Sequence, residues 1–103
     1  MDERRRSPRK PLSFFFNKYI GGYPHLCRAL DISTEGIRAV AISEPETRLE
    51  SFPIELRLPG EPQTLWLWAK RVRRSGRREV LELISTRSQD FHRLERYLSV
   101  VPS

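Results

Sequence analysis

The chain has one cysteine, Cys27, and two histidines, His25 and His92, among its 103 residues. A single cysteine excludes an intrachain disulfide, and nothing in the sequence is typical of an oxidising compartment. No cysteine or histidine pair has metal-ligand spacing, and no glycine-rich phosphate loop or nucleophile motif occurs. We therefore expect a protein that is not an enzyme, needs no metal or cofactor, and keeps Cys27 as a small buried apolar residue.

Long hydrophobic runs are also lacking. The densest apolar stretch near the N-terminus covers residues 12–16 and ends at Asn17-Lys18. Such a stretch is too short for a signal peptide or a membrane-spanning helix. The sequence therefore predicts a cytoplasmic protein that does not insert into a membrane. Its length suits one domain with a modest core.

Acidic residues are in deficit. Lysine and arginine together number 19 against 13 aspartates and glutamates, which gives a formal net charge of +6. This balance favours anionic partners, which could be nucleotides, nucleic acids or acidic proteins. Six basic residues flank one predicted hairpin: Lys70, Arg71, Arg73, Arg74, Arg77 and Arg78. We interpret them as a solvated hairpin, with a docking surface for an acidic partner as the alternative.

Alternating apolar and polar residues predict an antiparallel β structure. The alternation, bounded by turn residues such as Gly21-Gly22 and Ser75-Gly76, indicates strands over 12–20, 23–30, 37–42, 52–58, 64–73 and 77–84. In the fifth of these, Trp66 and Trp68 share one face, while leucines and an alanine form the other. A strand that is apolar on both faces is expected to line a barrel with one face and to lie under a helix with the other.

The C-terminal segment predicts that helix. Ser88 is a suitable N-cap and Asp90 is favourable in a first helical turn. An apolar stripe follows at helical spacing, made of Phe91, Leu94, Leu98 and Val101. We expect this stripe to pack on the strand that carries Trp66 and Trp68.

The first candidate binding stretch is Arg5-Arg6-Ser7-Pro8-Arg9. The planar guanidinium of arginine can pair bidentately with phosphate oxygens or with guanine O6 and N7. Pro8 disfavours a helix here, and an extended segment from Arg5 to Arg9 spans roughly 13 Å. Two arginines so spaced can contact opposite sides of one small anionic ligand. A solvated basic tail is the alternative for this stretch taken alone.

The second candidate stretch runs from Asp31 to Gly36 and reads Asp-Ile-Ser-Thr-Glu-Gly. The Asp31 carboxylate can accept hydrogen bonds from the N–H edge of a guanine, and Ser33 can donate to a phosphate or accept from a base. Gly36 allows a positive φ and a close approach of backbone and ligand. The same residue types are common in ordinary turns, so this stretch alone favours a strand-to-strand turn.

Taken together and in this order, the RxxxR and DxSxxG patterns resemble the signature of PilZ domains. The resemblance extends over nearly the whole chain. It implies a six-stranded antiparallel β-barrel with a C-terminal helix, and a receptor for the bacterial second messenger cyclic di-GMP. The ligand-binding residues that it implies are Arg5, Arg9, Asp31, Ser33 and Gly36.

Two more arginines are additional candidates. Arg4 directly precedes the RxxxR pattern, and in the family a basic residue there is associated with binding a stacked pair of ligands. Arg6 offers a second, imperfect register of the same pattern. The sequence leaves the number of bound ligands open.

The distribution of apolar residues suggests how such a receptor would signal. We expect residues 1–11 to form a flexible basic arm and residues 12–103 to form the barrel with its helix. A ligand that meets Asp31 and Ser33 would draw Arg5 and Arg9 across the barrel. The ordered arm would then change the surface that an unidentified protein partner meets.

Two other functions compete with this hypothesis. A small barrel rich in aromatic residues and arginines could bind nucleic acid in the manner of an OB-fold. A PilZ-like adaptor without nucleotide binding would depend on the basic hairpin and the C-terminal stripe, and not on Arg5. Because both short patterns occur together, we prefer the nucleotide receptor and do not expect a nucleic-acid partner.

Overall fold

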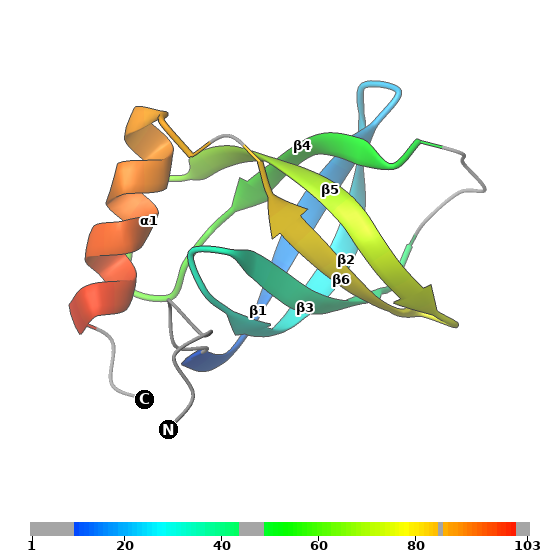
Figure 1. Ribbon diagram of the computed structural model, residues 1–103, viewed down its shortest axis with the longest axis horizontal. Coiled ribbons are helices and arrows are strands. Elements are labelled where there is room, and N and C mark those ends of the chain that lie inside the picture. Colours follow the sequence, from blue (N-terminus) through cyan, green and yellow to red (C-terminus); the bar gives the residue numbers. More distant parts are fainter. Residues whose placement is uncertain (1–9, 44–48, 85, 101–103) are drawn as a thin grey trace.

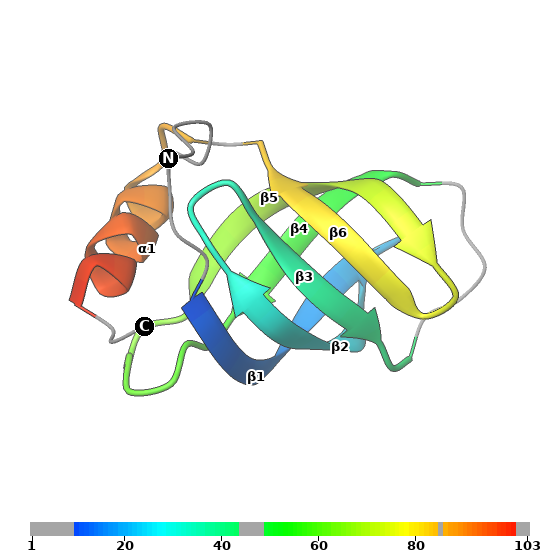
Figure 2. The same ribbon diagram turned by 60° about the horizontal axis from the view of Figure 1, so that its bottom comes forward.

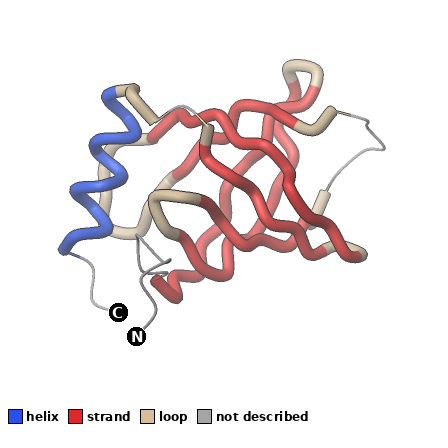
Figure 3. The backbone as a smooth tube through the Cα atoms, in the orientation of Figure 1, coloured by secondary structure: helices blue, strands red, loops and turns tan. Residues whose placement is uncertain are grey.

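A computed structural model describes residues 10–43, 49–84 and 86–100 of the chain. Its elements are β1 (Lys10–Ile20), β2 (Tyr23–Ile32), β3 (Gly36–Ala41), β4 (Ser51–Leu56), β5 (Leu65–Ser75), β6 (Arg78–Leu83) and α1 (Gln89–Val100). Figures 1 and 3 show the strands wrapped into a barrel with the helix beside it. The strands pair antiparallel in the closed order β1-β2-β3-β6-β5-β4. The predicted fold, a six-stranded antiparallel β-barrel with a C-terminal helix, is confirmed.

The β1–β2 hairpin shows how the sequence shapes the barrel. Gly21 and Gly22 have φ angles of 61° and 86°, a conformation that glycine adopts without a steric cost and that two-residue hairpins need. β1 pairs with β2 along most of its length, and its stretch from Phe16 to Lys18 also pairs with β4. That second pairing closes the barrel. β1 begins at Lys10, so the last two residues of the predicted arm, Lys10 and Pro11, belong to the barrel.

Inward-facing side chains of all six strands form one core with the helix. Buried members include Phe14, Phe16, Cys27, Ala29, Ile32, Ile37, Phe52, Ile54, Leu65, Leu67, Ala69, Leu81 and Leu83. Cys27 is fully buried, as its sequence context predicts. Leu65, Leu67 and Ala69 line the interior, which confirms the assignment of that face of β5.

The helix covers an end of the barrel and not the outer side of β5. In Figure 2, α1 lies across the end of the barrel at which β1 begins. Phe91, Leu94 and Leu98 are buried in the barrel core, whereas Trp66 and Trp68 remain 45% and 47% exposed. The helix contacts β5, as expected, but the expectation that the tryptophan face of β5 lies under it is wrong. Core side chains would be exposed to solvent at the open end of the barrel, and the apolar stripe of the helix buries them.

Local hydrogen bonds fix the start of this helix. The Ser88 hydroxyl accepts from the backbone N–H of Phe91 at 3.1 Å, so Ser88 is the predicted N-cap. Asp90 accepts from the backbone N–H of Trp66 at 2.9 Å and from Arg93 at 2.9 Å. The acidic first turn therefore also ties the helix to β5. Val101, the last residue of the predicted stripe, lies outside the described residues.

Candidate functional site

The turn between β2 and β3 carries the second predicted stretch, and Ser33 organises it. The backbone N–H of Ser33 donates to the carbonyl of Gly36 at 2.9 Å. Its hydroxyl oxygen accepts from the backbone N–H of Glu35 at 3.1 Å and from that of Gly36 at 3.3 Å. Ser33 is only 2% exposed. The buried Ser33 side chain therefore stabilises the turn through hydrogen bonds to its backbone. A contact between Ser33 and a ligand stays a prediction.

Gly36 is required by the barrel itself. It pairs with Glu82 of β6, and a Cβ atom built on Gly36 would lie 2.2 Å from the carbonyl oxygen of Leu81. Its φ is not positive, since the glycines with positive φ are Gly21, Gly22, Gly60 and Gly76. The positive φ that a glycine allows is therefore not adopted at Gly36. The close backbone approach that Gly36 permits is to β6, which anchors the turn to the neighbouring strand.

Asp31 lies beside an arginine on the outer surface of the sheet. It pairs with Arg38 of β3, and the Arg38 Nε is 3.8 Å from Asp31 Oδ2. Asp31 is partly exposed and Arg38 is exposed. Arg28, on the same strand as Asp31, is also exposed and donates to the Ser13 hydroxyl at 3.2 Å. The predicted carboxylate thus lies on a strand pair that carries two exposed guanidinium groups.

Sequence reasoning missed Arg28 and Arg38. The available signal was strand parity, because Arg38 alternates with the buried residues Ile37 and Ala39 and so had to face outward. What the sequence could not supply was the register. Only the pairing of β2 with β3 places Arg38 directly opposite Asp31.

The strand that directly follows the first predicted stretch in the sequence begins next to the second. β1 pairs with β2 at Lys10↔Ile32 and Pro11↔Asp31. The start of β1 and the β2–β3 turn lie at the same end of the barrel in Figures 1 and 2. Arg4, Arg5, Arg6 and Arg9 lie outside the described residues. Arg9 directly precedes Lys10 in the sequence.

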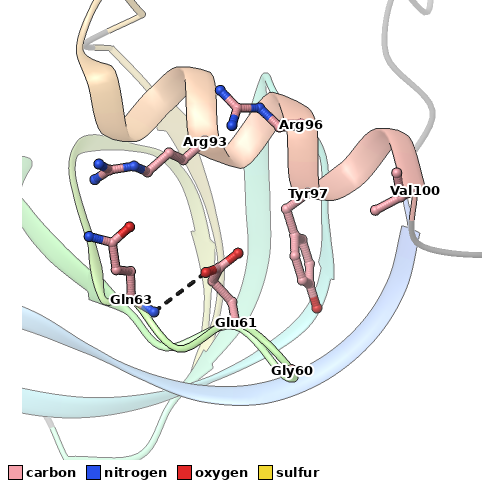
Figure 4. A pocket seen from close by; sticks show the side chains of 7 residues that line it. All are labelled: Gly60, Glu61, Gln63, Arg93, Arg96, Tyr97 and Val100. Atoms are coloured by element: carbon pink, nitrogen blue, oxygen red, sulfur yellow. Dashed lines mark hydrogen bonds between the residues drawn. The ribbon is translucent and has the colours of Figure 1, made fainter.

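A separate pocket of about 460 Å³ lies between α1 and the loop that follows β4 (Figure 4). Its lining consists of Gly60, Glu61, Gln63, Arg93, Arg96, Tyr97 and Val100. The Tyr97 hydroxyl donates to the Pro59 carbonyl at 2.7 Å. Burial, and then the nearby negative charge of Glu61, raise the pKa of Tyr97, so this hydroxyl stays a donor at neutral pH. Of the predicted nucleotide site, the members that the structure describes, Asp31, Ser33 and Gly36, do not line the pocket.

Two kinds of feature are absent from the described ranges 10–43, 49–84 and 86–100. These residues include no group of three or more histidine, cysteine, aspartate or glutamate side chains that could hold a metal ion. In the same part of the chain, no helix has the length and apolar character required to cross a membrane.

Comparison with known proteins gives matches at the level of structure. No family model matches the sequence, and no curated protein matches it. The PilZ domain of CeSA from a cellulose-synthesising bacterium is 18% identical, with a TM-score of 0.68 over 90% of this chain and 99% of that one. The PilZ domain of Escherichia coli YcgR, solved with c-di-GMP, is 18% identical with a TM-score of 0.70 over 94% and 90%.

A third similar structure is the Bacillus subtilis inhibitor of motility, MotI/DgrA. It is 21% identical, with a TM-score of 0.71 over 95% of this chain and 50% of that one. Likeness at these identities is a likeness of fold. The chain therefore has the fold of PilZ domains, as the resemblance of its two short patterns implied.

Proposed function

We propose that this protein is a receptor for cyclic di-GMP and that it acts as a regulatory adaptor, not as an enzyme. Its ligand would be bound by Arg5, Arg9, Asp31, Ser33 and Gly36, with Arg4 and Arg6 as additional candidates. The observation that supports this most is the pairing of Pro11 with Asp31. Through it, the strand that follows the arginine stretch in the sequence begins beside the strand that carries the carboxylate.

The chemistry of the ligand matches this arrangement. Cyclic di-GMP carries two phosphates and two guanines, and arginine can contact either group bidentately. Asp31 is positioned on the outer surface to accept from a guanine N–H edge. Extended backbone allows at most roughly 18 Å between Arg5 and Lys10, so both arginines can reach a ligand placed over Asp31. Ser33 and Gly36 would contribute chiefly by holding the turn in place.

The fold of the solved relatives supports the same proposal. The YcgR structure is that of a PilZ domain with c-di-GMP, and it superposes on 94% of this chain. A sequence identity of 18% is too low to infer from YcgR that this protein binds the same ligand. The proposal therefore depends on the two short patterns of this chain and on the pairing of Pro11 with Asp31.

Signalling would follow from ordering of the N-terminal arm. Residues 1–9 include Met1 as their only large apolar side chain, so they can bury little surface by themselves. In the proposed mechanism, the ligand supplies the contacts that hold Arg5 and Arg9 against the barrel. The arm would then cover part of the surface that a partner protein meets.

Calorimetry on two arginine variants tests the site. Arg9→Ala should weaken cyclic di-GMP binding strongly, because truncation of one member of a desolvated charge pair costs about 2–5 kcal/mol. Arg78→Ala removes an exposed arginine of the β5–β6 hairpin and is the matched control. Equal loss in both variants would indicate a diffuse electrostatic attraction and would contradict the proposed site.

A further inference from the structure

The outer side of β4 and β5 presents an exposed apolar surface. We call it the Trp face, and it consists of Tyr19, Pro53, Trp66, Trp68 and Ile84. The rings of Tyr19 and Trp66 are 5.1 Å apart, Pro53 pairs with Trp68, and the backbone N–H of Ile84 donates to the Trp68 carbonyl at 3.0 Å. Both tryptophans and Ile84 are nearly half exposed. The neighbouring side chains therefore form one continuous patch.

The Trp face continues along β5 into a strongly basic segment. The basic hairpin, as we name it, comprises the exposed residues Lys70, Arg73, Arg74, Arg77 and Arg78. On β5, the outward side chains of Trp66 and Trp68 are followed by Lys70 and, after a bulge between Arg71 and Arg73, by Arg73. At about 3.3 Å per residue, this stripe is roughly 23 Å long. Aromatic rings lie at one end of it and cations at the other.

The carboxylates near the basic hairpin do not cancel its positive charge. Glu79 is turned inward, is 3% exposed, and contacts Lys18 at 2.7 Å and Arg71 at 3.1 Å inside the barrel. Glu55, next to Trp66, is 8% exposed and accepts from Asn17 at 3.0 Å. Two exposed carboxylates lie beside the five cations of the hairpin: Glu82 is opposite Lys70, and Glu50 accepts from the backbone N–H of Arg71 through its carbonyl. An acidic partner would therefore meet a strong positive charge at the hairpin.

We propose that the Trp face and the basic hairpin together form a docking surface for an acidic protein segment. The segment would place an apolar side chain between Trp66 and Trp68 and its carboxylates along the hairpin. Tryptophan and arginine are the side chains that most often anchor protein interfaces. This inference names the chemistry of the partner in the proposed function.

Two observations favour a protein over a nucleic acid at this surface. Stacked bases alternate with phosphates along a strand, but here the rings and the cations occupy opposite ends of the stripe. The aliphatic Pro53 and Ile84 border the tryptophans and suit an apolar side chain better than a base. A second copy of the chain fits less well, because its own net charge is +6.

The surface can be tested apart from nucleotide binding. The Trp face and the basic hairpin lie on β5 and on segments that neighbour it, and they share no residue with the proposed nucleotide site. The full chain would be screened without nucleotide against a phage-displayed library of random dodecamers. We expect enriched peptides with one aromatic or leucine anchor beside several aspartates or glutamates. No enrichment, or enrichment of peptides without acidic residues, would overturn the proposal.

Variants then locate the binding of a synthetic enriched peptide by fluorescence anisotropy. Trp68→Ala and the double variant Arg73→Glu/Arg77→Glu should each weaken binding about tenfold or more. The matched controls are Phe15→Ala, an exposed aromatic on β1, and Arg96→Glu, an exposed arginine on α1. Circular dichroism checks that each variant is folded. Binding that survives both test variants, or falls equally in the controls, contradicts the proposal.

Two competing occupants give distinct results. A single-stranded oligothymidine that displaces the peptide and loses affinity in Trp68→Ala would identify a nucleic-acid surface and overturn the acidic-protein proposal. A dimer in sedimentation that dissociates in Trp68→Ala would assign the face to a second copy, which overturns it as well. A failure of cyclic di-GMP binding alters neither readout, so the two proposals fail independently.

Discussion

The ammonium group of Lys18 lies 2.7 Å from a carboxylate oxygen of Glu79, and both side chains are 0% exposed. Arg71 contacts the other oxygen of Glu79 at 3.1 Å. The Phe52 ring centroid is 5.1 Å from the Lys18 Nζ and 5.9 Å from the Arg71 guanidinium carbon. A buried ion cluster of Lys18, Arg71 and Glu79 therefore lies next to the ring of Phe52, at the end of the barrel opposite the helix.

Removal of the central carboxylate of this cluster should destabilise the barrel. Glu79→Ala leaves a buried lysine without its acidic partner, and breaking a buried pair in this way costs about 3–5 kcal/mol. The free energy of unfolding in urea measures the loss. Glu82→Ala, three residues along the same strand and exposed, should change it by only about 0.5 kcal/mol. Similar losses in both variants would show that the cluster contributes no special stability.

Gly36→Ala should destabilise the fold before it affects any ligand. The new Cβ would lie 2.2 Å from the Leu81 carbonyl oxygen, which is backbone and cannot rotate away. Forced backbone shifts of this kind cost about 1–3 kcal/mol. Thermal unfolding measures the effect, and Thr34→Ala in the same turn is the control. If Gly36→Ala melts like the wild type, the close approach of β3 and β6 does not require glycine here.

The strand pattern and the helix were predictable because their signals are local. Alternation gave the six strands, and Gly21-Gly22 gave the first hairpin. Lys18 also carried a signal, since it shares the parity of Phe14, Phe16 and Ile20, all of which face inward. We missed it because a buried lysine depends on Glu79, whose place in the barrel comes from register.

The other features that the sequence did not predict also depend on contacts between residues that are distant in the sequence. The position of the helix could not be predicted from Trp66 and Trp68, because a sequence does not distinguish an outer barrel face from an open barrel end. The role of Gly36 depends on Leu81, which is distant in the sequence. Arg5 and Arg9 lie outside the described residues, so their role in the candidate site stays a prediction.

The proposed signal can be followed by amide hydrogen exchange. Saturating cyclic di-GMP should give new protection in residues 4–10, because the ligand supplies contacts that this segment lacks by itself. The strand from Trp66 to Val72 serves as an internal control and should change little. An arm that is protected before ligand is added, or unprotected after saturation, would exclude ordering of the arm as the signal.

Binding selectivity tests the central claim most directly. Isothermal titration of the full chain compares cyclic di-GMP with cyclic di-AMP, which has the same charge but another base, and with GTP, a more highly charged guanine nucleotide that is not cyclic. We expect saturable binding of cyclic di-GMP that is at least about tenfold tighter than that of either competitor, a difference of about 1.4 kcal/mol. The titration also gives the number of ligands bound. Equal affinity for all three, or no binding of cyclic di-GMP, would contradict the account.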